Sequence, residues 1–276
     1  MSAHENDSKR LGQALKRARL TAGFTGVEAA RRAGMSQPKI SRLENAVQTP
    51  GLDDLDTLCS IYGLSPGERD ELQALTESLH RTVESSRSIR KGGGSHLKQL
   101  QIGRVEADTS VLRYFQPSTV PGLLQTAEFT RRIYGFTLEG EKLVAAMRAL
   151  QQRQNVLYDQ DKSFTFILTE QALRWRLAPN PVMAAQLHHI ASLSTLSNVT
   201  VGIIPWSAEV EEAPLHGFEI FDDRLVTVGL KTATISFTEP TDIKRYVDLF
   251  DSWKQSAALN DDAREHLSRI ARDYDS

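Results

Sequence analysis

The chain has 276 residues, which allows two domains with hydrophobic cores because one domain usually takes about 100 to 200 residues. Its composition, 40% hydrophobic and 25% charged, is that of an ordinary globular protein. No apolar run approaches the roughly 20 residues of a membrane span, and residues 1–5 lack the basic start and apolar core of a signal peptide. We therefore expect a cytoplasmic protein without membrane partners. The formal net charge of −2 hides an uneven distribution of charge along the chain.

A first helix is predicted over residues 11–21 by apolar residues at helical spacing. Residues 25–45 then read as two short helices that meet at a tight turn. Thr25 and Glu28 form a capping-box pattern that begins a helix near Gly26. Gly34 supplies the turn, because a backbone with positive φ is favourable for glycine. Ser36 is the expected N-cap of the next helix.

This second short helix has one apolar side and one polar side. Ile40 and Leu43 form its buried stripe, and Pro38 is tolerated in its first turn, where no intrahelical N–H bond is lost. The outward residues carry side chains that form hydrogen bonds with base edges or phosphates: Gln37, Lys39, Ser41 and Arg42. The pattern predicts a unit that reads DNA.

Charge is concentrated around this unit. Residues 9–45 contain nine Lys or Arg against two acids, a net charge of +7. Residues 46–80 contain one Arg against seven acids, a net charge of −6. A basic face followed by acidic helices indicates a confined phosphate-binding surface, because cations supply the sequence-independent affinity for DNA.

Two more helices complete the N-terminal half. Residues 49–51, Thr-Pro-Gly, open a fourth helix, and its Cys59 sits among leucines, which predicts a buried, reduced thiol. Ser65 and Glu68 form a second capping box, so a fifth helix runs to about His80. We expect an all-α, five-helix domain over residues 1–82.

Residues 83–96 are polar and rich in glycine and serine, and we interpret them as a linker. The run from Lys91 to Ser95 lacks the Gly-Lys-Ser/Thr of a nucleotide-binding loop and follows no strand. Residues 97–276 mix predicted helices with strands that become frequent after Asn198, and Asp222-Asp223 is a hairpin signal. We expect an α+β domain with a mostly antiparallel sheet.

The N-terminal half resembles the helix-turn-helix of phage-repressor-like, xenobiotic-response-element-type (XRE family) transcription regulators. Ala30, Gly34, Ile40 and Leu43 occupy the family's four packing positions. One departure is Gly26, which stands where the family usually has a glutamine that holds a phosphate. The resemblance, together with the outward side chains, predicts these DNA-binding residues: Arg17, Arg31, Ser36, Gln37, Pro38, Lys39, Ser41 and Arg42.

The second half resembles the C-terminal domain of WhiJ-like, antitoxin-like transcriptional regulators of actinobacteria. The most specific segment is residues 120–126, VPGLLQT; Glu106-Ala107, Tyr114 to Pro117 and Thr169 to Arg174 add to it. The resemblance implies a regulator whose C-terminal domain binds a small protein encoded nearby, as in a toxin-antitoxin pair. No ligand site is carried over from it.

Other chemistry has little support in the sequence. His188 and His189 are adjacent on a predicted helix, so they cannot chelate one metal together, and we expect them to be ordinary helix surface. Glu170 and Arg174, four residues apart, are expected to form a structural ion pair. The three tryptophans are expected in a core or an interface. We predict no metal, no cofactor and no catalytic residue, and therefore no enzyme.

Two interpretations remain open. The protein is a regulator controlled by a protein partner, or it is a one-component sensor whose C-terminal domain binds a small molecule. A deep apolar pocket with a few convergent polar groups would favour the second. In both cases we expect a homodimer on operator DNA, associated with the nucleoid, and the terminal helices are candidates for the dimer contact through Leu249, Phe250, Trp253, Leu267 and Ile270.

Overall fold

The computed structural model describes residues 3–85 and 94–274, so residues 86–93 of the predicted linker lie outside the described residues. The chain divides into two units. The first consists of Met1–Thr82 together with Ser236–Asp242, and the second of Val83–Ile235 together with Ile243–Ser276. The predicted boundary at residue 82 therefore leaves out a short segment that comes from far along the sequence.

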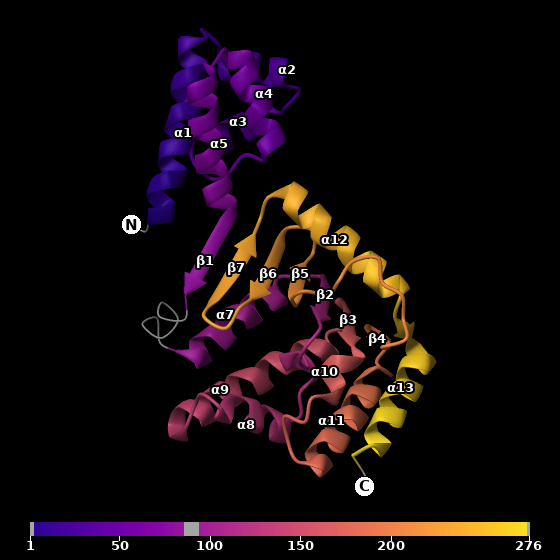
Figure 1. Cartoon of the computed structure of the whole chain (residues 1–276). Helices are drawn as coiled ribbons and strands as arrows, with labels where there is room; N and C mark the ends of the chain where they lie inside the picture. The colour runs from indigo at the N-terminus through magenta and orange to yellow at the C-terminus, as the bar shows by residue number, and fades with distance from the viewer. Residues whose placement is uncertain (1–2, 86–93, 275–276) are drawn as a thin grey trace. The chain divides into compact units, whose positions relative to one another are not determined.

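The first unit is helical (Figure 1). Its helices are α1 (Ala3–Thr21), α2 (Gly26–Ala33), α3 (Gln37–Glu44), α4 (Leu52–Tyr62) and α5 (Pro66–His80). Their shared core contains Leu11, Leu15, Ala29, Ile40, Leu43, Leu55, Leu58 and Cys59. Cys59 is a fully buried free thiol, and burial raises its pKa. The predicted capping box at Ser65 and Glu68 is present, and Gly34 ends α2 with φ of 66°.

The segment Ser236–Asp242 completes the N-terminal end of α4. The residue before this helix is Gly51, which has no side chain to cap it, and the carboxylate of Glu239 accepts a hydrogen bond from Leu52 N–H at 3.3 Å. A Cβ on Gly51 would lie 3.8 Å from the ring of Pro240. A carboxylate from another part of the sequence thus takes the place of the N-cap side chain.

His80 fastens the same segment to the end of α5. Its Nε2 lies 2.8 Å from Pro50 O, and because a carbonyl oxygen only accepts, this nitrogen carries a proton. Its Nδ1 lies 2.9 Å from the Thr238 hydroxyl. The second carboxylate oxygen of Glu239 lies 3.1 Å from Nε2 but forms no hydrogen bond, since the N–H points to Pro50. Both His80 and Glu239 are buried.

The second unit combines a sheet with helices on both faces (Figure 1). Its helices are α7 (Ser95–Ala107), α8 (Ala127–Gly135), α9 (Gly140–Gln154), α10 (Glu170–Arg174), α11 (Asn180–Leu193), α12 (Pro240–Gln255) and α13 (Asn260–Arg272), with short 3-10 turns at Gly122–Leu124 and Asn155–Tyr158. Its strands are β1 (Arg81–Ser85), β2 (Val111–Gln116), β3 (Ser163–Thr169), β4 (Val199–Ile204), β5 (Phe218–Phe221), β6 (Leu225–Gly229), β7 (Ala233–Phe237) and β8 (Ala258–Leu259).

The strand order is β1-β7-β6-β5-β2-β3-β4-β8. The two central pairs, β2 with β3 and β3 with β4, are parallel, whereas β2–β5, β5–β6 and β4–β8 are antiparallel. The sheet is therefore mixed, and the expected mostly antiparallel arrangement is not confirmed. The reason is that β2, β3 and β4 are separated by long helical connections, which parallel neighbours require.

The two faces of the central strands enter different cores. On one face, the rings of Tyr114 and Phe166 stack with their centroids 4.9 Å apart. They belong to a hydrophobic cluster that also contains residues of α8, α11 and α13. On the other face, the ring centroid of Phe115 lies 3.9 Å from that of Trp253 on α12. Central strands covered on both sides lose the alternation of apolar and polar residues, which explains the continuous apolar run in β3.

The terminal helices use their apolar residues inside the chain. Phe250, Trp253, Leu267 and Ile270 are all at most 2% exposed, although a single chain is present. The predicted dimer contact through these four residues is wrong, because they are buried within the chain. Leu249, the fifth residue of that prediction, is half-buried.

Three further expectations have mixed outcomes. Arg174 Nε donates to Glu170 at 2.6 Å, which confirms the structural ion pair. Trp253 lies in the core as expected. Trp175 and Trp206 are 49% and 65% exposed, so they do not belong to the core.

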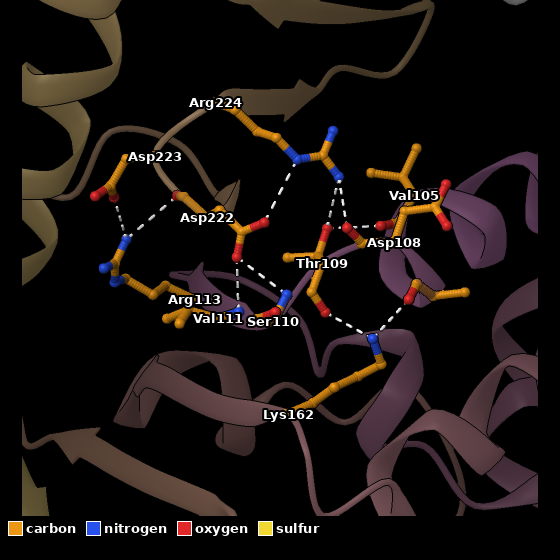
Figure 2. A network of polar contacts seen from close by, with 11 residues as sticks. Val105, Asp108, Thr109, Ser110, Val111, Arg113, Lys162, Asp222, Asp223 and Arg224 are labelled. Carbon is orange, nitrogen blue, oxygen red and sulfur yellow. Dashed lines mark hydrogen bonds and ion pairs between the residues drawn. The ribbon is translucent and has the colours of Figure 1, made fainter.

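The hairpin turn between β5 and β6, predicted from Asp222-Asp223, is fastened to the start of β2 (Figure 2). Asp222 has a φ of 49°, and its carboxylate accepts hydrogen bonds from Ser110 N–H and Val111 N–H at 3.0 and 2.8 Å. Burial raises the pKa of Asp222, but these two donors and the Arg224 guanidinium together outweigh it, so the pKa lies below its ordinary value. Arg113 binds the neighbouring Asp223 at 3.0 Å. The turn and the strand edge therefore form one polar network.

The φ of Gly34 gives a test of the turn between α2 and α3. A Cβ at Gly34 would meet nothing within 4 Å, and the same holds for Gly67 in α5, whose φ is negative. Gly34→Ala should therefore destabilise the first unit through backbone conformation alone, by about 1 to 2 kcal/mol. Gly67→Ala should stabilise it by about 0.4 to 1 kcal/mol. Hydrogen exchange of the α2 and α3 amides in the full chain measures both, and equal effects would contradict the argument.

Glu239 gives a test of the segment that caps α4. Glu239→Ala removes the partner of Leu52 N–H, and we expect a loss of about 1 kcal/mol, the usual effect of a lost cap. Asp242→Ala is the matched control, because this acid of the same segment makes only a 3.6 Å ion pair with the exposed Arg81. Hydrogen exchange should accelerate at residues 52–55 in the first variant only. Equal exchange in the two variants would show that Glu239 does not hold the helix.

Candidate nucleic-acid interface

Helix α3 begins where the sequence predicted. Ser36 accepts a hydrogen bond from Lys39 N–H at 3.3 Å, and Pro38 occupies the first turn. Ile40 and Leu43 are each 2% exposed and fix one side of the helix in the core. The opposite side is therefore presented outward in a fixed orientation.

Two contacts with α1 hold α3 in place, and sequence reasoning missed both. A Cβ at Gly12 would lie 2.7 Å from Glu44 O, so the two helices cross with no room for a side chain. Arg19 is buried and donates from Nε and Nη2 to the two carboxylate oxygens of Glu44, at 2.5 and 2.9 Å. These hydrogen bonds raise the pKa of Arg19. Arg19 was counted with the basic face, but it is an internal clamp.

Three of the predicted DNA-binding residues are exposed at the start of α3: Ser36, Gln37 and Pro38. Gln37 lies over Gly26, since a Cβ there would be 3.7 Å from Gln37 Nε2. Arg42, one turn later, is exposed and donates to the side-chain oxygen of Gln48 at 3.3 Å. Gln37 and Arg42 thus stand on the open side of the helix.

Lys39 and Ser41 are less free than the sequence suggested. Lys39 Nζ lies 2.7 Å from a carboxylate oxygen of Asp54 on α4. Ser41 is half-buried, and its hydroxyl accepts from the side-chain amide of Asn45 at 3.3 Å. The Asp54 carboxylate therefore competes with a phosphate for Lys39, whereas the Ser41 hydroxyl keeps its own O–H to donate.

Arg31 is exposed on α2 and bound to Glu28. Thr25 caps Glu28 N–H at 3.1 Å, but the carboxylate of Glu28 does not return to the backbone of Thr25, so the predicted capping box is only half formed. The carboxylate instead accepts from Arg31 at 3.0 Å and from Arg32 at 2.7 Å. These hydrogen bonds lower the pKa of Glu28 to about 2.

Arg17 is not brought together with the other predicted residues. It lines a groove between α1 and α5 with Tyr62, Glu68 and Glu71. It lies two positions from Arg19, which is close to the opposite side of a helix. The structure therefore brings Arg31 and Arg32 together on Glu28 and leaves Gln37 and Arg42 exposed on α3, but it places Arg17 in a different groove.

Some of the missed residues carried a signal in the sequence. Gly12 interrupts an otherwise regular helical stripe, and a glycine inside a helix often marks a close approach. Asn45 and Gln48 are polar residues directly after α3 and reach back to it. Asp54 had no such signal, because its pairing with Lys39 depends on how α3 and α4 pack.

This arrangement of capped short helices around a glycine turn defines the helix-turn-helix class. A family model described as a helix-turn-helix domain matches residues 10–72, so the N-terminal part is a DNA-binding domain of this class. A second model, described as a domain of unknown function (DUF5753), matches residues 99–269. Because this match covers more than half of the sequence, the chain belongs to the DUF5753 family.

Solved structures show only weak likeness. Nuc, a phospholipase D family member from Salmonella typhimurium, has a TM-score of 0.34 and 12% identity over 65% of this chain and 97% of that chain. NucT from Helicobacter pylori has a TM-score of 0.40 and 8% identity over 64% and 97%. TrmBL2, an archaeal chromatin protein, has a TM-score of 0.34 and 11% identity over 90% and 94%. Likeness at this level carries no functional information. No curated protein matches the chain.

Membrane and metal sites were both predicted to be absent. In residues 3–85 and 94–274 no helix has the length and apolar character to cross a bilayer. Within the same described ranges, no three His, Cys, Asp or Glu side chains come close enough to hold a metal ion.

The Lys39–Asp54 pair predicts how this surface responds to a change of charge. Asp54→Asn should free Lys39 to bind a phosphate, so that affinity for nonspecific duplex DNA rises. The slope of log affinity against log salt concentration should steepen by about one unit, because one more phosphate is neutralised. Asp53→Asn is the control, because this exposed neighbour carries the same charge and makes no ion pair among the described residues. Fluorescence anisotropy at several salt concentrations distinguishes the two. If the salt dependence of DNA affinity has the same slope in both variants, Asp54 does not keep Lys39 from binding a phosphate.

Proposed function

We propose that this protein is a sequence-specific transcriptional regulator in which α3 enters the major groove of its operator. The observation that carries the proposal is the exposure of Gln37 and Arg42 on a short helix whose other side is fixed in the core. Glutamine pairs well with adenine and arginine with guanine in the major groove. These two side chains would therefore read bases.

Phosphate binding is assigned to cations that are now held by carboxylates. Glu28 holds Arg31 and Arg32, and Asp54 holds Lys39. A DNA phosphate competes for such cations because exposed ion pairs contribute only about 0 to 1 kcal/mol. Binding would exchange one anionic partner for another. Arg17 is not part of this surface.

The C-terminal domain is proposed to regulate DNA binding through a small protein encoded nearby, in an antitoxin-like arrangement, and to have no catalytic activity. What supports this is the resemblance of residues 120–126 and 169–174 to WhiJ-like regulators. We also propose a homodimer, because one helix-turn-helix domain offers few base contacts and two half-sites about one helical turn apart supply more. The dimer contact would lie outside the buried faces of α12 and α13.

A second candidate is a one-component regulator that responds to a small molecule. The observation that favours it is a hollow of about 540 Å³ in the C-terminal domain, lined by residues of α8, α9 and α11. This volume falls within the range of about 300 to 1,000 Å³ that is usual for ligand sites.

The test selects DNA from a random duplex pool with the full-length protein and repeats the selection with variants. Gln37→Ala and Arg42→Ala should each relax the preference at one base position, by about 1 to 3 kcal/mol. Arg69→Ala is the control, because this arginine of α5 pairs with Asp56, away from α3. The DNA-reading assignment fails if both α3 variants select the same sequence with the same affinity as the unmodified protein.

Pull-down of the neighbouring gene product, followed by a gel shift on the selected DNA, tests the regulatory half separately. A partner that binds and changes the shift supports the antitoxin-like arrangement. A protein that reads DNA but retains no neighbouring product, and whose DNA binding responds to a small molecule instead, supports the second candidate.

A further inference from the structure

The segment VPGLLQT, residues 120–126, has no role in DNA reading, but its last two residues, Gln125 and Thr126, line the hollow between α8, α9 and α11. Gln125 is 6% exposed, and its side chain donates to Val120 O at 2.8 Å and accepts from the Thr130 hydroxyl at 3.0 Å. These internal hydrogen bonds fix the orientation of the Gln125 amide.

Two other glutamines fasten the backbone of this segment. Gln154 Nε2 donates to Gly122 O and Gln125 O, at 2.8 and 2.7 Å. Gln186, fully buried on α11, accepts from Thr126 N–H at 2.8 Å and donates to Leu124 O at 2.6 Å. Four hydrogen bonds from α9 and α11 thus hold the floor rigidly. A preorganised floor lowers the entropy that is lost when a ligand binds.

The walls of the hollow are apolar. Leu143, Val144, Met147 and Leu150 of α9 face it, and Val144 is 47% exposed although it is a β-branched apolar residue. An occupant with an apolar body would remove this surface from water, at about 25 cal/mol for each Å² buried.

The polar lining favours an anion. Arg131 and Arg148 line the hollow, and no Asp or Glu does. Arg131 has a partner in Glu128, at 3.8 Å, whereas Arg148 forms no ion pair with any residue that the structure describes. Arg148, a cation without a carboxylate partner among the described residues, would suit a ligand with one negative charge.

His189 adds a hydrogen-bonding group. It was expected to be ordinary helix surface, but it is half-buried and lines the hollow, unlike the exposed His188. Desolvation by burial lowers the pKa of His189, so the ring is neutral near pH 7 and presents one donor and one acceptor. Within the described residues it has no hydrogen-bond partner.

We propose that this hollow binds a small amphipathic monoanion, in which a carboxylate lies against Arg148 and an apolar chain or ring lies along Leu143, Val144 and Met147. This inference deepens the second candidate function by naming the class of ligand. It does not depend on DNA binding, because occupation of the hollow is measured directly.

The test is isothermal titration calorimetry of the full-length protein with decanoate, decanol and decylammonium, each below its micelle concentration. The three probes share one apolar chain and differ only in head-group charge. Decanoate should bind with a stoichiometry of one, and about two- to fivefold more tightly than decanol, because Arg148 is exposed and an exposed ion pair contributes little. Decylammonium should not bind measurably.

Three variants place the binding in the hollow. Arg148→Gln should weaken decanoate binding about two- to fivefold and leave decanol binding unchanged. Met147→Trp should abolish binding by filling the space. Arg104→Gln, an exposed arginine of α7 outside the lining, should change nothing. Thermal denaturation of each variant verifies that it is folded.

Several outcomes would overturn the proposal. Equal affinity for decanoate and decanol would remove the anion site, and undiminished binding in a folded Met147→Trp protein would place it elsewhere. Absence of saturable decanoate binding would leave the hollow to another occupant, such as an acidic segment of a protein partner. Failure of DNA reading alone would not alter any of these results.

Discussion

The buried ion pair between Arg19 and Glu44 is the contact on which the DNA-binding unit depends. Both side chains are about 10% exposed, and the guanidinium also donates to Phe24 O at 2.7 Å. One arginine therefore joins the end of α1, the loop before α2 and the last residue of α3. Removing one partner from a buried pair costs about 3 to 5 kcal/mol, because the other charge stays buried without compensation. The orientation of α3 is set by this pair and by the close crossing at Gly12.

Ion pairs also hold several of the positive charges in residues 9–45. Arg19 is internal, Arg31 and Arg32 share Glu28, and Lys39 is held by Asp54. These four of the nine cations in this segment are therefore held by carboxylates. DNA phosphates would have to displace carboxylates, which makes affinity sensitive to salt and to the geometry of the partner. Arg42, whose partner is the neutral Gln48, is the exception on α3.

Local signals in the sequence predicted much of this fold, and nonlocal contacts account for what they missed. The caps at Thr25, Ser36 and Ser65 and the turn at Gly34 depend on residues within about one helical turn of each other, so the pattern contains the information. The partner of Arg19 and the parallel pairing of β2, β3 and β4 depend on packing between distant segments. The helical pattern of apolar residues also does not distinguish a buried arginine from an exposed one, because both lie off the apolar stripe. The expectation that α12 and α13 form a dimer contact failed for this reason: an apolar helix face does not specify whether its cover comes from the same chain.

The cap on α4 shows how far such nonlocal dependence reaches. Glu239 follows Leu52 by 187 residues, yet it binds the first N–H of the helix that supports Lys39 through Asp54. His80 holds Pro50 and Thr238 from the end of α5. The helix-turn-helix unit is therefore incomplete until the chain has been made through Asp242, and a fragment that ends near residue 82 leaves both His80 and the start of α4 without their partners. Because the capping segment contains the end of β7 and the first residues of α12, the stability of α4 is tied to elements outside the matched helix-turn-helix region.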